Sequence, residues 1–485
     1  MSHSAIVNGK PLAGDGAPFE VTDPATEERL ATIPEAGPAL VDQAVEAARA
    51  SFADKRWRGL DIEARQDHLR RAADAIEAAA DELAALESAN TGIPYSQIRA
   101  RQIGRAAHNF RFFADYIGQS TSELYEQNRD FLTFVRREPV GVAALISPWN
   151  APIALGSMKV AAAIAFGNSC ILKPSEVAPL GISRLIELIQ PMLPEGVVNL
   201  LNGRGQTTGD ALVRHPGVDL VSFTGGTRTG AHILSAAGAR LKPATMELGG
   251  KSANIIFADA DMDRALDGAL LGIFTNNGQQ CLAGSRILVQ RPVYEAFVEA
   301  FVARAKRIKI GHPADPATEI GPLVSHPHMA HVLGFAEQAG AGARLLTGGR
   351  RATGFERGFY VEPTVVAVES NSHRICQDEI FGPFAAVMPF DTAAEAWAIA
   401  NDSRFGLASY VWTESLSTAV EAQDNIDAGV VWINTPMMRE LRAPFGGIRD
   451  SGIGAEGGRA CEAFYTRQKT VTLPRRNLPL RRLGA

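Results

Sequence analysis

Cys281 lies in the stretch FTNNGQQCLAGS (residues 274–285), among amide side chains, glycines and small residues. A thiolate is a strong nucleophile, and small neighbours leave room beside the sulfur for a carbonyl carbon and for backbone N–H groups. A lone cysteine is more often an inert, buried residue. The loop by itself therefore leaves both a catalytic and a packing role open.

Two other polar residues come directly after apolar runs. Glu247 ends the run in ATMELGGKS, and Asn150 ends LISPWN. A carboxylate at a strand end, facing a glycine turn, can act as a general base on water, and an amide N–H can stabilise an oxyanion. The ordinary readings are a surface or capping glutamate and a turn-forming asparagine.

Phosphate and ribose contacts have candidates in CILKPSE and FTGGTRTG. Lys173 is a cation for phosphate, and Glu176 is an acceptor for ribose hydroxyls. Glycines at a turn from strand to helix leave helix N-terminal N–H groups free for a pyrophosphate. The spacing of Gly225, Gly226 and Gly230 differs from GxGxxG, so the pattern alone is a weak indication of a dinucleotide site.

The elements that must position these residues follow from periodicity. Apolar residues recur at three- and four-residue spacing over 39–52 and 64–90, which predicts amphipathic helices. After about residue 131, short runs rich in Val, Ile and Leu alternate with helical stretches, and a second such series spans 252–433. The alternation predicts βαβ units and two α/β domains in tandem, each around a buried parallel sheet.

Length and composition are those of an ordinary soluble protein with two or more domains. The chain has 485 residues, 46% hydrophobic and 21% charged, with a net charge of −5, which disfavours nucleic-acid binding. No apolar run approaches the roughly 20 residues of a membrane span, and the N-terminus lacks a signal-peptide pattern. We therefore expect a cytoplasmic protein without membrane contact. The four cysteines have neither metal-site nor disulfide-framework spacing, so no metal is expected.

Taken in order, SPWN, LKPSE, FTGGT, MELGGKS, NNGQQC, EIFGPF and PFGG resemble the NAD(P)-dependent aldehyde dehydrogenase superfamily, from VNGKP to KTVTL. The resemblance implies an α/β fold with a Rossmann-like NAD-binding domain (1–118 and 140–248) and an α/β catalytic domain (249–445). It also implies a small β oligomerisation arm (119–139 and 468–485) and a homodimer or homotetramer.

The resemblance also implies roles for single residues. Cys281 matches the nucleophile, Glu247 the base that activates the deacylating water, and Asn150 the side-chain donor of the oxyanion hole. A carboxylate at Glu176 would repel a 2′-phosphate, which favours NAD over NADP. The positions that match cofactor contacts are Ile146, Ser147, Pro148, Trp149, Lys173, Ser175, Glu176, Gly209, Phe223, Gly225, Gly226, Gly230, Leu248, Glu379 and Phe381.

The substrate is indicated by arginines before PFGG. Arg439 and Arg442, in RELRAPFGG, resemble the branch that oxidises hydroxymuconate- or aminomuconate-type semialdehydes, and Arg105 matches a further arginine of that branch. Guanidinium groups bind carboxylates in bidentate fashion. Alternatively, these arginines form structural salt bridges.

Three other functions remain in view. A broad-specificity or betaine-aldehyde dehydrogenase would favour aromatic walls over arginines. A catalytically silent relative would be expected to lose the thiol or the base, and a thiol hydrolase would need a histidine beside Cys281. Four residues depart from common family choices without removing a catalytic group: Met158, Gly226, Arg449 and Ala455.

Overall fold

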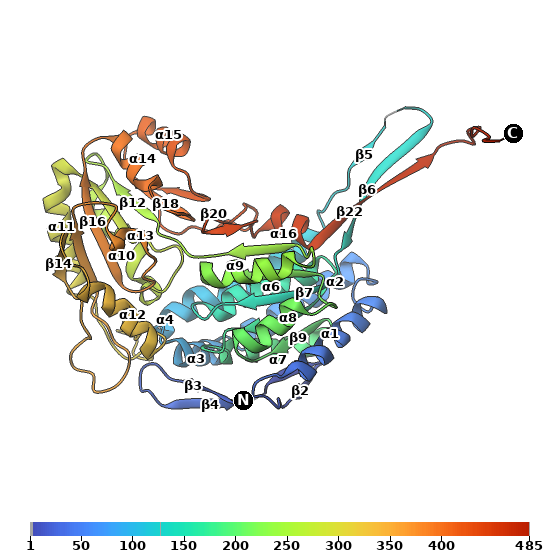
Figure 1. Cartoon of the computed structure of the whole chain (residues 1–485), viewed down its shortest axis with the longest axis horizontal. Helices are drawn as coiled ribbons and strands as arrows, with labels where there is room; N and C mark the ends of the chain where they lie inside the picture. Colours follow the sequence, from blue (N-terminus) through green and yellow to red (C-terminus); the bar gives the residue numbers. More distant parts are fainter. Residues whose placement is uncertain (1–2, 127, 485) are drawn as a thin grey trace.

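The computed structural model describes residues 3–126 and 128–484, arranged as two α/β lobes with a β arm projecting from one of them (Figure 1). The chain first builds most of the lobe that carries the N-terminus. It then builds the second lobe and returns to the first before ending in the arm. This arrangement confirms the predicted fold class.

The first lobe contains an eight-stranded sheet whose central five strands run parallel, in the order β9-β8-β7-β10-β11. Antiparallel strands extend both edges, so the sheet is mixed rather than purely parallel. The members are β1 (Ala5–Val7), β2 (Lys10–Leu12), β7 (Val142–Ser147), β8 (Ser169–Pro174), β9 (Val198–Leu201), β10 (Leu220–Thr224), β11 (Ala244–Glu247) and β21 (Gly452–Ile453).

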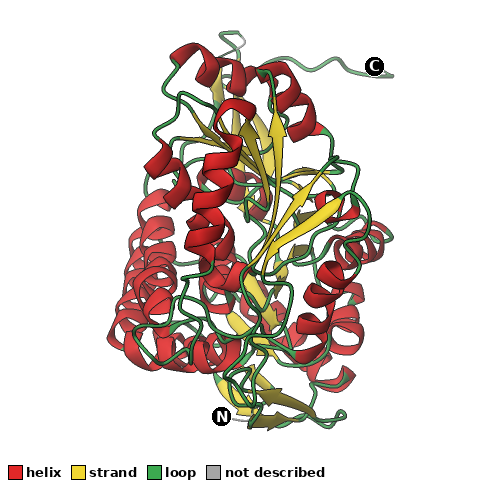
Figure 2. Cartoon of the chain, turned by 90° about the vertical axis from the view of Figure 1, so that its left-hand side faces the viewer, coloured by secondary structure: helices red, strands yellow, loops and turns green. Residues whose placement is uncertain are grey.

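Helices cover both faces of this sheet, and each face has its own apolar core. Figure 2 shows helices on both sides of the strands. One face holds α2 (Ile62–Ala78), α3 (Ala80–Thr91), α5 (Gly104–Ile117), α6 (Pro152–Ala165), α7 (Leu180–Ile189) and α16 (Gly458–Tyr465). The other holds α1 (Pro38–Ala53), α8 (Asp210–Arg214) and α9 (Thr227–Gly238).

The second lobe is built on a seven-stranded sheet, also mostly parallel, with an antiparallel edge strand β14. In spatial order its strands are β14 (Ala343–Thr347), β15 (Thr364–Val368), β16 (Phe384–Phe390), β13 (Arg286–Gln290), β12 (Ala253–Ile256), β18 (Ala408–Trp412) and β19 (Val430–Ile433). Its helices are α10 (Met262–Phe274), α11 (Arg291–Ala305), α12 (His326–Glu337), α13 (Arg374–Gln377), α14 (Ala393–Asn401) and α15 (Leu416–Asn425).

The arm is a three-stranded antiparallel sheet in the order β22-β6-β5. Strand β22 (Thr466–Pro474) pairs with β6 (Phe131–Pro139) along nine residues, and the short β5 (Leu124–Tyr125) lies on the other side of β6. The arm projects away from both lobes (Figure 1). Small two-stranded sheets, β3 (Phe19–Thr22) with β4 (Arg29–Ile33) and β17 (Phe405–Gly406) with β20 (Ile448–Arg449), complete the strands.

The predicted helix over 64–90 is two helices, because Ala79 leaves the helical region (φ −100°, ψ 18°) and separates α2 from α3. A short helix α4 (Tyr95–Gln97) and a π-helical turn (Ile98–Ile103) then lead into α5. Among the described helices, none combines the length and apolar character that a membrane crossing requires.

Candidate active site

Asn150, Glu247 and Cys281 lie where the two lobes meet. Asn150 follows the carboxyl end of β7, and Glu247 is the last residue of β11, in the same sheet. Cys281 lies in the loop between α10 and β13 of the other lobe. Carboxyl ends of parallel strands form the crevice in which α/β proteins bind ligands. The fold therefore brings the three predicted residues to one edge.

The loop before Cys281 has an unusual backbone. Asn276, Asn277 and Gly278 all have left-handed φ values, of 58°, 57° and 71°. Asparagine and glycine tolerate this region better than other residues do. A Cβ at Gly278 would collide with the backbone of Gly382. The amide and glycine residues around the thiol therefore allow a turn that brings two backbone segments close together.

Amide side chains fix this loop to the oxyanion candidate. Asn276 Nδ2 donates to the backbone oxygens of Asn150 and Gln279, at 2.9 and 3.0 Å. Asn150 Nδ2 donates to the same Gln279 oxygen at 3.0 Å and uses one amide hydrogen in doing so. Its second amide hydrogen is left for another acceptor. Asn150 thereby lies in a fixed orientation against the cysteine loop.

Electrostatics at the site favour the neutral forms of both Cys281 and Glu247. Burial raises the pKa of the Cys281 thiol to about 12, helped by the charges of Glu379 and Glu247 and opposed by Arg105. Burial and the negative charge of Glu456 raise the pKa of Glu247 well above its ordinary value. Neither oxygen of Glu247 has a hydrogen-bond partner among the described residues. A buried carboxylate with both oxygens free is typical of a catalytic group.

A buried ion pair beside Glu247 had no clear sequence signal. Lys159 Nζ binds Glu456 Oε1 at 2.8 Å and Ser222 Oγ at 2.9 Å. Burial acts to raise the pKa of Glu456, but Lys159, Arg439 and Arg105 outweigh it and hold the pKa below its ordinary value. Glu456 therefore stays charged and acts on Glu247. Lys159 and Glu456 are 297 positions apart, so no local pattern could have paired them.

Arg105 and Arg439 lie in the same electrostatic cluster. The Arg439 guanidinium lies 4.1 Å above the ring of Phe445, and its Nη2 is 3.5 Å from the backbone oxygen of Glu456. Burial and the charge of Arg105 lower the pKa of Arg439 to about 10. The buried Nε atoms of both arginines have no acceptor among the described residues. Arg105 thus keeps donor capacity near Cys281, and Arg439 keeps it near Arg105 and Glu247.

Arg442, the third predicted substrate arginine, lies elsewhere. Its side chain is 77% exposed, and it forms a two-pronged contact with Glu440 at 2.9 and 3.0 Å. For this residue the geometry matches the alternative of a local salt bridge. Arg442 is only three residues from Arg439, but the chain turns between them. The sequence alone therefore could not show whether Arg442 binds substrate or forms a salt bridge.

The predicted cofactor crevice has features that fit a dinucleotide. The hydroxyls of Ser147 and Thr224 are buried without partners among the described residues, and they end the neighbouring strands β7 and β10. Gly226 is the N-cap of α9, and a Cβ there would meet open space. Free helix N–H groups beside unpaired hydroxyls suit a pyrophosphate. These residues could therefore hold NAD.

Lys173 and Glu176 lie together at the end of β8, with Nζ and Oε2 3.1 Å apart. Burial acts to raise the pKa of Glu176, but the charge of Lys173 outweighs it, so the pKa lies below its ordinary value. Burial lowers the pKa of Lys173. Glu176 is therefore an ionised acceptor with a part-exposed carboxylate, as a ribose contact requires.

The loop at 379–381 faces the crevice from the second lobe. Glu379 Oε1 accepts from the Gly250 backbone N–H at 2.9 Å, and burial raises the pKa of Glu379 to about 7. The rings of Trp149 and Phe381 meet edge to face at 5.3 Å. His328, which sequence reasoning missed, contacts the backbone oxygen of Phe381 through Nε2 at 2.7 Å, and burial lowers its pKa to about 4.

The remaining predicted cofactor residues form the floor and walls of the first lobe's edge. Ile146, Phe223 and Leu248 are buried in the core under α9. A Cβ at Gly225 would strike the Phe223 ring, and one at Gly230 would strike Leu248. Pro148 and Ser175 follow β7 and β8, and Gly209 precedes α8. Across the described residues, no group of His, Cys, Asp and Glu side chains is arranged to bind a metal.

Comparison with known proteins agrees with this geometry. The model of the aldehyde dehydrogenase family matches residues 12–471. The chain is 44% identical to a 5-carboxymethyl-2-hydroxymuconate semialdehyde dehydrogenase of Escherichia coli, over 93% of this chain and 97% of the relative. It is 39% identical to a 2-hydroxymuconic semialdehyde dehydrogenase of Pseudomonas sp. strain CF600, over 95% and 96%.

The solved NAD⁺ complex of an aldehyde dehydrogenase from Bacillus cereus has the same fold. Its TM-score is 0.96 at 39% identity, with 98% of this chain and 97% of that chain covered. Fold, site geometry and the full-length family match lead to one assignment. The chain belongs to the aldehyde dehydrogenase family, whose enzymes oxidise aldehydes with NAD(P).

Proposed function

We propose that this enzyme oxidises an aldehyde bearing a carboxylate, of the (carboxymethyl-)hydroxymuconate semialdehyde type from aromatic catabolism, to the carboxylic acid with NAD. The observation that carries the proposal is the pair Arg105 and Arg439, whose buried Nε atoms have no acceptor among the described residues. The charge of Arg105 acts on Cys281, and Arg439 lies within electrostatic reach of Arg105 and Glu247. The names of the two semialdehyde dehydrogenases similar to this chain support it.

The first half of the reaction uses Cys281 and Asn150. Because burial raises the pKa of the Cys281 thiol to about 12, the sulfur must first release its proton to water, and the thiolate forms more readily as the pH rises. The thiolate adds to the aldehyde carbon, and the second amide hydrogen of Asn150, with the backbone N–H of Cys281, stabilises the oxyanion. NAD held by Ser147, Thr224 and Glu176 would supply the hydride acceptor, and loss of the hydride would leave Cys281 as a thioester.

The second half uses Glu247 as a general base. Its carboxylate deprotonates a water that attacks the thioester, which frees Cys281 and the carboxylic acid. A base works best when its pKa is near the working pH, and burial together with the charge of Glu456 moves Glu247 in that direction. The ion pair of Lys159 with Glu456 therefore sets the strength of the base.

The arginine pair suits an anionic substrate. Arg105 and Arg439 repel each other, which contributes to the lowered pKa of Arg439. A carboxylate placed between them would relieve this repulsion and accept charge-assisted hydrogen bonds. A cationic aldehyde such as betaine aldehyde would be repelled instead, which disfavours the alternative of a betaine-aldehyde dehydrogenase.

Arg439→Ala tests the substrate assignment. We expect kcat/KM for a carboxylated semialdehyde to fall about tenfold or more, since a charge-assisted hydrogen bond is worth about 1.5–3 kcal/mol. The value for a neutral aldehyde of similar size should change little. Steady-state NADH formation measures both, with Arg442→Ala as the matched control and Cys281→Ala as the inactive reference. Equal losses for both aldehydes would remove Arg439 from substrate recognition.

We further propose a preference for NAD, carried by the ionised Glu176 at the end of β8. A carboxylate there repels a 2′-phosphate and accepts bonds from ribose hydroxyls. At equal subsaturating concentrations the rate with NAD should exceed the rate with NADP. Glu176→Gln should bring the ratio of these two rates closer to one. A wild-type enzyme that reduces NADP as fast as NAD would contradict the proposal.

We also propose a homodimer or homotetramer joined through the arm. The arm exposes large apolar side chains on its outer strands β5 and β22, whose outer edges pair with no strand among the described residues: Leu124 is 59% exposed, Tyr125 52% and Leu473 48%. Edges and apolar surface of this kind are usually covered in a working protein.

A further inference from the structure

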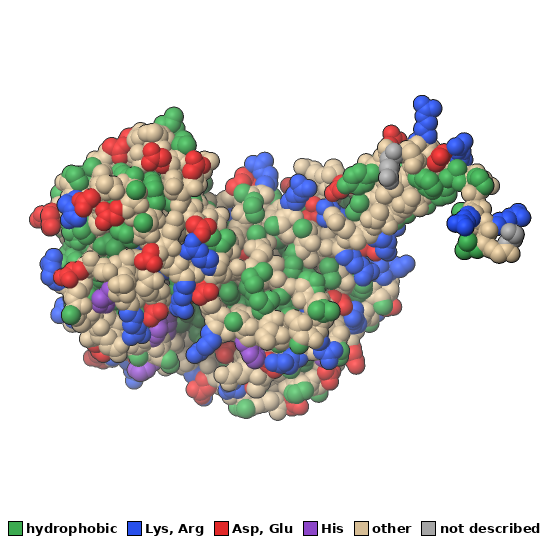
Figure 3. All heavy atoms as spheres, turned by 45° about the horizontal axis from the view of Figure 1, so that its top comes forward, with side chains coloured by type: hydrophobic (Ala, Val, Ile, Leu, Met, Phe, Trp, Pro, Cys, Tyr) green, Lys and Arg blue, Asp and Glu red, His purple; other side chains and the backbone are tan. Residues whose placement is uncertain are grey.

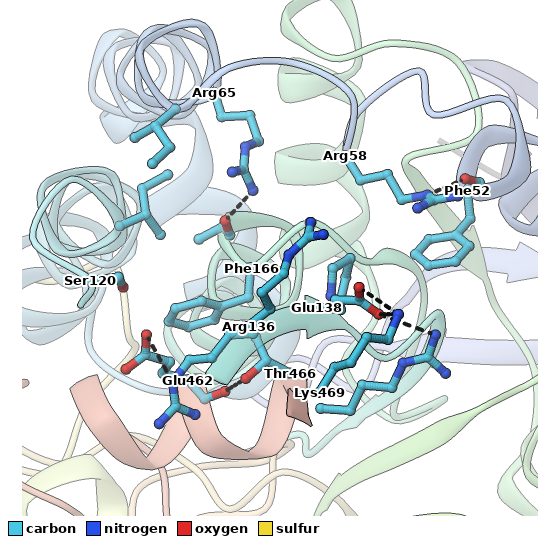
Figure 4. A pocket seen from close by; sticks show the side chains of 17 residues that line it. Phe52, Arg58, Arg65, Ser120, Arg136, Glu138, Phe166, Glu462, Thr466 and Lys469 are labelled. Carbon is cyan, nitrogen blue, oxygen red and sulfur yellow. Dashed lines mark hydrogen bonds and ion pairs between the residues drawn. The ribbon is translucent and has the colours of Figure 1, made fainter. Parts of the chain in front are cut away.

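A cavity of about 530 Å³ lies at the foot of the arm, and its lining includes none of the residues of the proposed reaction (Figure 4). It is formed by β6 and β22 of the arm, by α2 and by the segment after α1. Figure 3 shows Lys and Arg side chains gathered at the foot of the arm and at its tip. Its charged lining residues are Arg58, Arg65, Arg136, Arg137, Arg467, Lys469, Glu138 and Glu462.

The two acidic residues of this basic cavity are already engaged. Glu138 binds Lys469 at 2.7 Å and lies 3.7 Å from Arg467. Glu462 lies 3.8 Å from Arg137 and accepts a hydrogen bond from the hydroxyl of Tyr116. Of the three other arginines, only Arg136 is acted on by one of these carboxylates, that of Glu138, which it shares with Lys469 and Arg467. The lining offers no carboxylate for Arg58 and Arg65.

Those three arginines come from separate elements. Arg58 donates Nε to the backbone oxygen of Phe52 at 2.7 Å and lies over the Phe52 ring. Arg65 donates Nη1 to the Ala165 oxygen at 3.1 Å. Neither contact neutralises the positive charge.

Arg65 and Arg136 extend toward each other across the cavity (Figure 4). The Nε atom of Arg65 is buried and has no acceptor among the described residues. Asp61 is the acidic residue whose charge acts on Arg65. Its side chain caps α2 by accepting a hydrogen bond from the Ala64 N–H at 3.0 Å. The cavity lining gives neither guanidinium an ion pair of its own, and an anion between them would be attracted by both positive charges.

We propose that the basic cavity binds a small anion with two or more negative charges, bearing phosphate or several carboxylates. Guanidinium forks match the oxygens of both groups, and a concave basic surface concentrates such anions. Since Arg65 belongs to the lobe and Arg136 to the arm, the bound anion joins the two and stiffens their junction. The site is independent of the proposed substrate and of the cofactor crevice.

Thermal unfolding of the full-length enzyme tests this site, with saturating NAD present so that the cofactor crevice is occupied. Inorganic pyrophosphate is the first probe and citrate the second, each compared with NaCl at equal ionic strength. We expect a saturable rise in Tm with one or both probes. For Arg65→Gln with Arg136→Gln we expect about tenfold weaker binding by calorimetry, given the worth of a charge-assisted hydrogen bond.

Arg344→Gln, an exposed arginine on the distant β14, is the matched control and should bind as the wild type does. If the double variant fails to fold, the single variant of the exposed Arg136 should still weaken binding. A response no larger than that of NaCl, or unchanged affinity in the cavity variants, would overturn the proposal. Binding that occurs only after the subunits are separated would also overturn the proposal, because it would mean that a neighbouring subunit fills the cavity in the assembled enzyme. Turnover is not measured, so failure here leaves the proposed reaction untouched.

Discussion

At the scale of single residues, Glu247 has the most distinctive surroundings, because it is 5% exposed and both oxygens lack partners among the described residues. We predict that Glu247→Gln forms NADH in a burst of about one equivalent per subunit and then turns over about 10²–10⁴-fold more slowly, because only the hydrolytic half of the reaction uses this base. The thioester should accumulate. Rapid-mixing absorbance measures the burst, and intact-protein mass spectrometry detects the acylated Cys281.

The pH dependence follows from the raised pKa of Glu247. A raised pKa means that the basic, ionised form grows only as the pH rises through that value, so the wild-type kcat should increase toward alkaline pH. The high pKa of Cys281 acts in the same direction. Glu247→Gln should lose this rise in the hydrolytic step, and a variant with wild-type turnover and the same profile would exclude Glu247 as the base.

Sequence reasoning found the residues that end strands. Asn150 and Glu247 were predictable because an apolar run that stops at a polar residue marks a strand end, and parallel strand ends meet at one edge. Lys159, Glu456 and His328 were not predictable in this way. Their partners lie 297 and 53 positions away in the chain, and periodicity reports only on near neighbours.

At the scale of elements, α3 holds the start of the helix that follows Asn150. Glu87, on α3, is fully buried, and its two oxygens accept from the Ile153 backbone N–H in the first turn of α6, at 3.1 and 3.2 Å. Asn90, also on α3, accepts from the Leu180 N–H in the first turn of α7 at 3.0 Å. Both helices begin at the crevice edge, so α3 positions the segment that carries Asn150.

Burial raises the pKa of Glu87 from 4.5 to about 8. A group whose pKa is raised by folding stabilises the fold at low pH, and this contribution is lost as the pH rises toward that value. We predict that the wild-type Tm falls by several degrees relative to Glu87→Gln between about pH 5 and about pH 9.

Glu87→Ala, which leaves the Ile153 N–H without its partner, should lower both Tm and kcat at every pH, since a buried orphan donor costs about 1–3 kcal/mol. Glu77→Gln, on the surface of α2, serves as the control for a simple loss of charge. Differential scanning calorimetry measures the Tm of each variant across the pH range. Parallel curves of Tm against pH for the wild type and Glu87→Gln would contradict the prediction.

Periodicity predicted most helices and the core strands, but it missed boundaries and edges. The break at Ala79 has no Gly or Pro to announce it. The antiparallel strands β1, β2 and β21 are two or three residues long, too short for a visible alternation. Such strands form because a neighbouring strand offers free N–H and C=O groups, which is a property of the assembled sheet.

At the scale of the whole molecule, the arm is the part with least support from its own chain. Strand β22 pairs with β6 on one side, and its other edge has no strand partner within the described residues. A small sheet needs a buried apolar face, or packing against another element, to be stable in water. The exposed Leu124 and Leu473 therefore need a neighbour, and a second copy of the chain can supply one.

We predict that Leu124→Lys with Leu473→Lys shifts the enzyme from two or four subunit masses toward the single subunit in light scattering coupled to size exclusion. Charges on an apolar interface must be desolvated on association, which weakens it. Leu416→Lys is the matched control, since Leu416 is 80% exposed at the start of α15, away from the arm. Because the proposed catalytic residues all come from one chain, separated subunits should keep bound NAD and a reactive Cys281 at low temperature. A wild-type enzyme that is monomeric, or a doubly substituted arm that leaves the oligomer intact, would show that subunits do not associate through these strands.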